Sequence, residues 1–175
     1  MSEIYNPAED SYFFAEFLKK YFKGARGKIK YLDMGSGSGI LAETAIKFLG
    51  RKNVFAVDIN PDSVKQLKKK NINAIKSNLF KNVNGKFDAV SFNAPYLPRD
   101  EREPIPSRIY TTGGKRGDEI SIKFLKQAKK HLNRNGKIFL LISTLTPTDR
   151  IKNFDGKIVA RKKIDFEELK ILEFE

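Results

Sequence analysis

The chain has 175 residues, 40% of them hydrophobic, and carries 34 Lys plus Arg against 21 Asp plus Glu, a formal net charge of +13. This length and composition predict one globular domain over residues 1–175 and exclude a disordered or fibrous chain. The absence of cysteine excludes disulfides, thiol nucleophiles and Cys-ligated zinc, and the single histidine, His131, excludes a pair of histidine metal ligands.

The basic excess suggests a polyanionic neighbour, such as RNA, DNA or the ribosome, because exposed cations gain from counterion release and long-range steering. The lysines recur in KQLKKK (65–70) and KQAKKHLNRNGK (126–137), on expected helices, so a solvated basic surface explains them equally well. No apolar run approaches the roughly 20 residues that span a bilayer. The opening MSEIYNPAED has carboxylates where a signal peptide would be basic, so we expect a cytoplasmic protein with no membrane partner.

The first half of the chain alternates between helical and strand patterns. SYFFAEFLKKYF (11–22) places apolar side chains every three or four positions and predicts a helix. KIKYLDM (28–34) predicts a short strand that leads through the glycine loop GSGSG into a helix at ILAETAIKFL (40–49). NVFAVDI (53–59) predicts a second buried strand, and PDSVKQLKKKN (61–71) a helix with proline in its first turn.

The second half continues this alternation and then ends differently. NAIKSN (73–78) and KFDAVSF (86–92) predict the third and fourth strands, DEISIKFLKQAKKHLN (118–133) a helix, and KIFLLIST (137–144) the fifth strand. GKIVARKKID and EELKILEFE predict a terminal hairpin with an antiparallel strand. The pattern as a whole predicts an α/β fold, in which helices cover both faces of a mostly parallel sheet and the crossovers are right-handed.

The glycine loop predicts a cofactor site. Gly35, Gly37 and Gly39 directly follow a strand, and glycine lets the backbone pass close to a ligand where a Cβ would clash. A dinucleotide fingerprint would need its third glycine at position 40, which is Ile40, so an adenosine without a pyrophosphate fits this loop better. Asp58, about 20 residues further on, is placed to accept hydrogen bonds from two ribose hydroxyls. The alternative is a tight turn, with Asp58 at a helix start.

A second carboxylate belongs to this candidate site. Asp33 sits at the mouth of the strand before the glycine loop, where its carboxylate can face an ammonium or a sulfonium.

The stretch FNAPYLP follows the fourth strand and is predicted to lie beside the cofactor crevice. The side-chain oxygen of Asn93 and a nearby main-chain carbonyl can accept both hydrogens of a planar NH₂ group, and Tyr96 can cover its flat face. Holding a weak nitrogen nucleophile in line with a methyl donor lowers the barrier without a strong base. The alternative is a turn that contains Pro95, with Tyr96 packed on the core.

These motifs resemble those of class I S-adenosylmethionine-dependent methyltransferases, and FNAPYLP resembles their N-P-P-Y signature with Ala94 in place of the first proline. YNPAEDSYFF and TTGGKRGDEI resemble motifs of the HemK-like glutamine N5-methyltransferases, of the short eukaryotic and archaeal type. Taken alone, the first of these indicates a helix start and GGKRG a flexible lead into the next helix. The known substrate of this type is the glutamine of the Gly-Gly-Gln loop in a class 1 translation termination (release) factor.

The resemblance implies a Rossmann-like, seven-stranded fold, S-adenosyl-L-methionine as cofactor, and roles for particular residues. Where the family has an aspartate near the adenine, this chain has Asn78, and TPTDRIKNFDG is too short for the family's full helix. The residues implied to bind the cofactor are Ser11, Asp33, Gly35, Gly37, Asp58, Asn78, Leu79 and Asn93. Those implied to bind the substrate are Asn93, Ala94, Pro95, Tyr96 and Leu97, with Asn93, Pro95 and Tyr96 as the catalytic group.

The family also works with a small zinc-binding activator protein that pairs along an exposed sheet edge, here expected at residues 73–76. Two other functions remain open from the sequence. Asn93 and Tyr96 could clamp a flipped adenine or guanine in RNA or DNA, which the +13 charge favours. The chain could also be a cofactor-binding module without catalysis, such as a ribosome-assembly subunit.

Overall fold

The protein is described by a computed structural model that covers residues 7–24, 28–102 and 111–175. The first two residues of YNPAEDSYFF and part of the polar connection predicted over 99–115 lie outside these ranges. In the described ranges one sheet has seven strands, namely β1 (Tyr31–Met34), β2 (Val54–Asp58), β3 (Asn73–Lys76), β4 (Phe87–Asn93), β5 (Leu132–Ser143), β6 (Lys157–Ile164) and β7 (Glu167–Phe174). The helices are α1 (Glu9–Gly24), α2 (Ile40–Leu49), α3 (Pro61–Lys69) and α5 (Glu119–Ala128), with short 3-10 turns η1 (Arg51–Asn53), η2 (Lys129–His131) and η3 (Ile151–Phe154).

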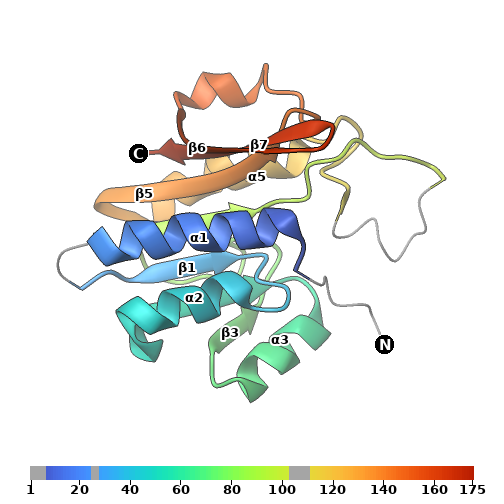
Figure 1. Ribbon diagram of the computed structural model, residues 1–175. Coiled ribbons are helices and arrows are strands. Elements are labelled where there is room, and N and C mark those ends of the chain that lie inside the picture. The colour runs from blue at the N-terminus through green and yellow to red at the C-terminus, as the bar shows by residue number, and fades with distance from the viewer. Residues whose placement is uncertain (1–6, 25–27, 103–110) are drawn as a thin grey trace.

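The strand order across the sheet is β3-β2-β1-β4-β5-β7-β6 (Figure 1). Strands β1 to β5 pair in parallel, whereas β7 runs antiparallel to both β5 and β6. The predicted mostly parallel α/β sheet and its C-terminal hairpin are therefore confirmed. No helix in the described ranges combines the length and the apolar character that crossing a bilayer requires.

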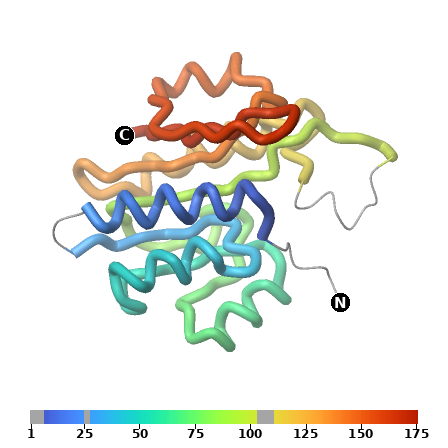
Figure 2. The backbone as a smooth tube through the Cα atoms, viewed as in Figure 1, coloured from blue at the N-terminus to red at the C-terminus, as the bar shows by residue number. Residues whose placement is uncertain are grey.

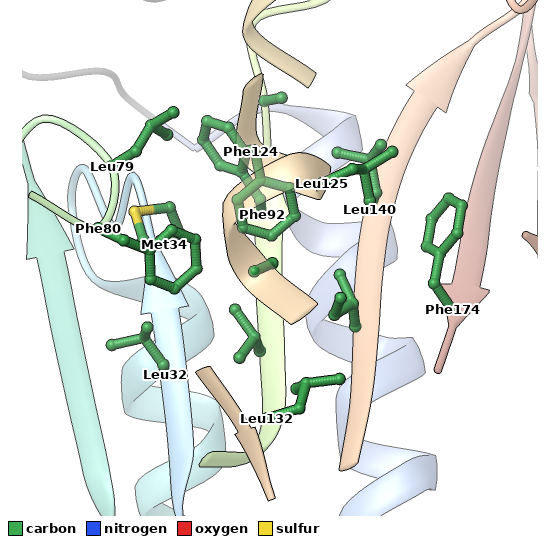
Figure 3. Close-up of a cluster of buried hydrophobic side chains, with 14 of the residues drawn as sticks. Leu32, Met34, Leu79, Phe80, Phe92, Phe124, Leu125, Leu132, Leu140 and Phe174 are labelled. Atoms are coloured by element: carbon green, nitrogen blue, oxygen red, sulfur yellow. The ribbon is translucent and has the colours of Figure 1, made fainter. Parts of the chain in front are cut away.

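Each face of the sheet buries its own hydrophobic cluster. Phe139 of β5 packs with α1, where its ring lies 4.7 Å from Tyr21 between centroids, while its neighbour Leu140 faces the opposite cluster. On that opposite face Phe92 meets Phe124 of α5 at 4.9 Å (Figure 3). Alternate residues of β5 thus serve both faces, which explains why its sequence is a continuous apolar run.

The helix predicted over 118–133 ends earlier than expected, at Ala128. Residues 129–131 form η2, in which the His131 ring stacks on Phe80 at 4.6 Å, and β5 begins at Leu132 because Leu132 pairs with Phe87 of β4. Tertiary pairing and burial of Leu132 override the helical pattern of KKHLN at this point.

The carboxyl ends of β1, β2 and β4 lie in register, since Met34 pairs with both Val57 and Phe92. The glycine loop, Asp58 and the loop after β4 therefore leave the sheet at one edge. The start of α1 reaches the same end of the molecule, as the backbone trace shows (Figure 2).

Candidate active site

A cavity of about 1190 Å³ opens at this edge of the sheet. Its walls come from the start of α1, the glycine loop, the end of β2, the loop after β3, and the segments after β4 and before α5. Every residue that the sequence assigned to cofactor, substrate or catalysis contributes to its lining, namely Ser11, Asp33, Gly35, Gly37, Asp58, Asn78, Leu79, Asn93, Ala94, Pro95, Tyr96 and Leu97.

The glycine loop has left-handed backbone at all three glycines, with φ of +64° at Gly35, +51° at Gly37 and +92° at Gly39. A Cβ on Gly35 would lie 2.7 Å from the Phe92 ring, and one on Gly39 would lie 2.6 Å from Leu67. At these two positions the space that glycine leaves is filled by side chains of the protein, whereas the sequence suggested a close approach to a ligand. The loop is shaped by its φ angles and by core packing.

Asp58 ties the glycine loop to the end of β2. Its two carboxylate oxygens accept hydrogen bonds from the backbone N–H of Gly37 at 2.7 Å and of Asn60 at 2.8 Å. The side chain is 6% exposed. Burial raises the pKa of this carboxyl, and the backbone hydrogen bonds lower it by a smaller amount. Each carboxylate oxygen can accept a further hydrogen bond, so Asp58 can shape the loop and still bind hydroxyl groups of a ligand.

Asp33 is the most deeply buried carboxylate of the cavity, at 1% exposure. It accepts hydrogen bonds from the backbone N–H of Ala42 at 3.2 Å and from Ser91 Oγ at 3.4 Å. Burial raises the pKa of this carboxyl to about 7, so near neutral pH the group is poised between its charged and neutral forms. A cationic ligand group would favour the charged form.

Asn93, at the end of β4, has its carboxamide fixed from one side only. Its Nδ2 donates to Asp10 Oδ2 at 3.0 Å and to Ser11 Oγ at 3.4 Å, both from the first turn of α1. Its Oδ1 is buried, and no group in the described part of the chain donates to it. An unpaired buried acceptor costs on the order of 1–3 kcal/mol, so a ligand that donates an N–H at this point gains a ready partner.

Tyr96 lies half-buried between the cavity and the core. It lines the cavity and also packs against the hydrophobic cluster under α1 and α2. Burial raises the pKa of its phenol, and the carboxylates of Asp10 and Glu167 raise it further, so the phenol stays protonated at neutral pH.

The segment TTGGKRG before α5 holds the loop after β4 in place. Leu97 N–H donates to Thr111 O at 2.9 Å, and Gly113 N–H donates back to Leu97 O at 3.0 Å. A Cβ on Gly113 would lie 2.5 Å from Pro95 O, and one on Gly117 would lie 2.8 Å from Tyr96 O. The structure therefore gives these glycines a packing role that GGKRG, taken alone, did not indicate.

At the other side of the cavity, the loop after β3 supplies Asn78, which is exposed, and Leu79, which is buried with a left-handed φ of +49°. A left-handed leucine is uncommon and marks a strained position of the kind found at ligand sites.

Sequence reasoning missed several residues of the cavity. Asp10 was assigned only to a helix start, because no local pattern connects it with Asn93. The described residues contain no group of three or more His, Asp or Glu that could hold a metal ion. Thr111, Thr112 and Lys115 also line the cavity; they belong to the TTGGKRGDEI motif, but the sequence assigned them no role. The lining residues without a sequence signal include Arg99, Glu101 and Lys123.

Comparison with known proteins agrees with this geometry. The family described as "Methyltransferase small domain" matches residues 10–167. A protein of Methanocaldococcus jannaschii, named as a candidate protein N5-glutamine methyltransferase, is 38% identical over 97% of this chain and 90% of its own length. A release factor glutamine methyltransferase of Borreliella burgdorferi is 34% identical over 63% of this chain, and the match spans 43% of that longer protein.

Among solved structures, a ribosomal protein L11 methylase from Lactobacillus delbrueckii subsp. bulgaricus superposes with a TM-score of 0.68. At 21% identity over 97% of this chain and 81% of that one, this likeness shows the fold alone.

Proposed function

The chain belongs to the methyltransferase small-domain family, and on that premise we propose that it methylates N5 of a protein glutamine, in the Gly-Gly-Gln loop of a class 1 release factor. The observation that carries this proposal is the carboxamide of Asn93, which lines the cavity and whose buried oxygen has no donor in the described chain. A glutamine side chain ends in a planar NH₂ group that supplies such donors.

The cavity residues fit S-adenosyl-L-methionine. Asp33 would pair with its ammonium, Asp58 would accept hydrogen bonds from its ribose, and Asn78 and Leu79 would contact its adenine, with Ser11 beside them. The buried carboxyl of Asp33, with its raised pKa, is the observation that favours a ligand bearing a positive charge. When bound, this cofactor supplies a methyl group carried on a sulfonium.

The chemistry assigned to the chain is positioning and electrostatic stabilisation. The Asn93 oxygen and the adjacent Ala94 carbonyl would accept the two hydrogens of the target NH₂ and stabilise the positive charge that develops on its nitrogen. Tyr96 would cover the flat face of the amide, and Pro95 and Leu97 would shape the loop around it. The N-methyl amide then loses its extra proton to water, so no buried base is required.

Cofactor affinity is expected to fall by about tenfold when the pH drops from about 8 to about 6. In the free protein the pKa of Asp33 is raised from 3.8 to about 7, so the carboxyl must lose a proton before it can pair with an ammonium. An ammonium paired with Asp33 would lower this pKa in the complex, so affinity is expected to decline progressively as the pH falls through about 7. In the protein without cofactor, the pKa of Asp33 is higher in the folded state than in the unfolded state. The contribution of Asp33 to the stability of the free protein therefore declines as the pH rises through 7.

Isothermal titration calorimetry with S-adenosyl-L-methionine across this range measures the effect. Asp33→Asn should bind weakly and with little pH dependence. A wild-type affinity that does not change with pH would show that Asp33 does not meet the charged group.

The proposed substrate is tested by incubating the protein with methyl-labelled cofactor and an archaeal or eukaryotic release factor, either wild type or with the loop glutamine replaced. Label is expected in the wild-type factor alone. Equal labelling of both factors would refute the proposed target residue.

The rival reaction, methylation of an exocyclic amine of adenine or guanine, is favoured by the net charge of +13. It predicts transfer of label to RNA or DNA and a steep fall of binding with salt. Label in nucleic acid would establish methylation of a nucleobase. If no label reached either release factor or nucleic acid, the result would favour a cofactor-binding module without catalysis.

A strand-pairing partner, such as a small zinc-binding activator, is part of the proposal. Strand β3 is an edge strand of the described sheet, and Asn73, Ile75 and Lys76 are exposed on it. An exposed edge offers unpaired backbone groups to a further strand. Slower amide hydrogen exchange over residues 73–76 after addition of the activator would support this pairing, and unchanged exchange would contradict it.

A further inference from the structure

Asp10 is a buried carboxylate that the proposed chemistry does not use directly. It lies in the first turn of α1, is 7% exposed, and lines the same cavity as Asn93. Its Oδ1 accepts hydrogen bonds from the backbone N–H of Ser11 at 2.6 Å and from Ser11 Oγ at 3.2 Å. Its Oδ2 accepts one from Asn93 Nδ2 at 3.0 Å, across 83 positions of sequence.

The contact between Asp10 and Asn93 selects one of the two orientations of the Asn93 carboxamide. A carboxylate can only accept hydrogen bonds, so it holds the NH₂ group of Asn93 and rejects the flipped amide, whose oxygen would face a negative charge. The orientation that remains leaves Oδ1 as the free acceptor. If the amide flipped, its NH₂ would oppose the NH₂ of the target, and two sets of donors would meet.

The charge of Asp10 acts in the same direction. A carboxylate that accepts from one end of an amide polarises it and increases the electron density on its oxygen, as in other hydrogen-bond chains of low local dielectric. A more negative Oδ1 stabilises the positive charge that develops on the target nitrogen.

We propose that Asp10 is the positioning residue of this site, and that it fixes and polarises the carboxamide of Asn93 so that Oδ1 faces the target NH₂. The inference rests on the proposed function in one respect, namely that the target is a planar NH₂ group. The Asp10–Asn93 contact itself can be measured without any substrate.

A reciprocal exchange tests this role. Asp10→Asn is expected to lower kcat by about tenfold to thirtyfold, with the KM for cofactor changed little, because the amide of Asn93 is then free to flip. Asn93→Asp should lower kcat further, because two carboxylates about 3 Å apart repel each other. In the double variant Asp10→Asn with Asn93→Asp, the NH₂ group at position 10 again donates to an oxygen at position 93. Its kcat should be at least about tenfold higher than that of Asn93→Asp alone.

Glu9→Gln is the matched control. Glu9 lies in the same helical turn, its side chain is 65% exposed, and it pairs with Lys162 rather than with the cavity. This variant removes one carboxylate from the start of α1 and should keep kcat within about twofold. If Asp10 only stabilised the helix start, Asp10→Asn and Asn93→Asp would each lower the melting temperature. The variant that carries both changes would then show the product of their two losses in kcat, without recovery. That result would overturn the inference.

A spectroscopic readout separates failure of this inference from failure of the proposed function. The side-chain ¹H–¹⁵N signals of Asn93, identified by their loss in Asn93→Ala, should shift in Asp10→Asn and stay in place in Glu9→Gln. Unchanged signals in Asp10→Asn would refute the contact, whatever the protein methylates. Shifted signals in a protein that labels no glutamine would support the contact and refute the proposed substrate.

Discussion

Asn93→Ala is expected to lower kcat for methyl transfer by about 10²- to 10³-fold, the usual effect of removing one preorganised group that stabilises transition-state charge. The variant loses the oxygen that would accept a hydrogen of the target amide. Stability should fall little, because the lost side chain makes its described hydrogen bonds only to Asp10 and Ser11, and the substitution also removes the buried oxygen that had no donor. Single-turnover kinetics with labelled cofactor measure the loss.

To assign the loss in kcat of Asn93→Ala to the methyl-transfer step, cofactor affinity and a control variant at another asparagine are also measured. Titration calorimetry should show the affinity of Asn93→Ala for S-adenosyl-L-methionine within a few-fold of wild type, because Asp33 and Asp58 are untouched. Asn153→Ala changes an exposed asparagine of η3 that does not line the cavity and should keep full activity. A kcat for Asn93→Ala within threefold of wild type would remove the basis for calling Asn93 catalytic.

Gly113→Ala and Gly117→Ala are each expected to lower kcat by about 10²-fold, although neither residue is assigned a contact with the reacting groups. A Cβ on Gly113 would lie 2.1 Å from Gly117 O and 2.5 Å from Pro95 O. A Cβ on Gly117, where φ is +96°, would lie 2.8 Å from both Tyr96 O and Pro98 N. The obstructing atoms are backbone, so the loop after β4 must move, and a shift of about 1 Å at a reacting centre can cost about 10²-fold.

The matched control for these variants is Gly24→Ala, at the exposed end of α1, where an added Cβ has no atom within 4 Å. It should leave both kcat and stability unchanged or slightly improve stability. Melting temperature and cofactor affinity should be recorded for all three variants. If Gly113→Ala and Gly117→Ala kept wild-type kcat, the packing of TTGGKRG against the loop would not be what positions Asn93.

The close packing of Gly113 and Gly117 against the loop after β4 gives a physical role to the long connection between β4 and α5. The described end of that connection returns to the cavity and bonds to Leu97 and Arg99 through backbone groups. Such backbone pairing fixes a loop more firmly than side-chain contacts alone, and a firmly held loop is what an acceptor pair for a planar NH₂ group requires.

The sequence predicted the order of helices and strands because their signals are local. A period of three to four residues marks a helix, a short apolar run bounded by glycine or asparagine marks a buried strand, and both can be recognised without knowing the partners. It also placed the glycine loop, Asp58 and the loop after β4 beside one cavity, since the carboxyl ends of parallel strands meet at one edge, but it missed other lining residues such as Asp10. It was wrong at residues 129–133, where pairing of Leu132 with Phe87 ended the helix.

What the sequence by itself determined is thus the α/β alternation and the set of loops that surround one cavity. Only the tertiary structure decided which atoms within that set touch: Asp10 with Asn93, the Gly37 amide with Asp58, and Gly117 with the backbone of Tyr96. These contacts join segments far apart in the chain, and their distances depend on how α1 and two loops pack against the sheet. Packing of that kind is set by the whole core and leaves no periodic trace in the residues that it brings together.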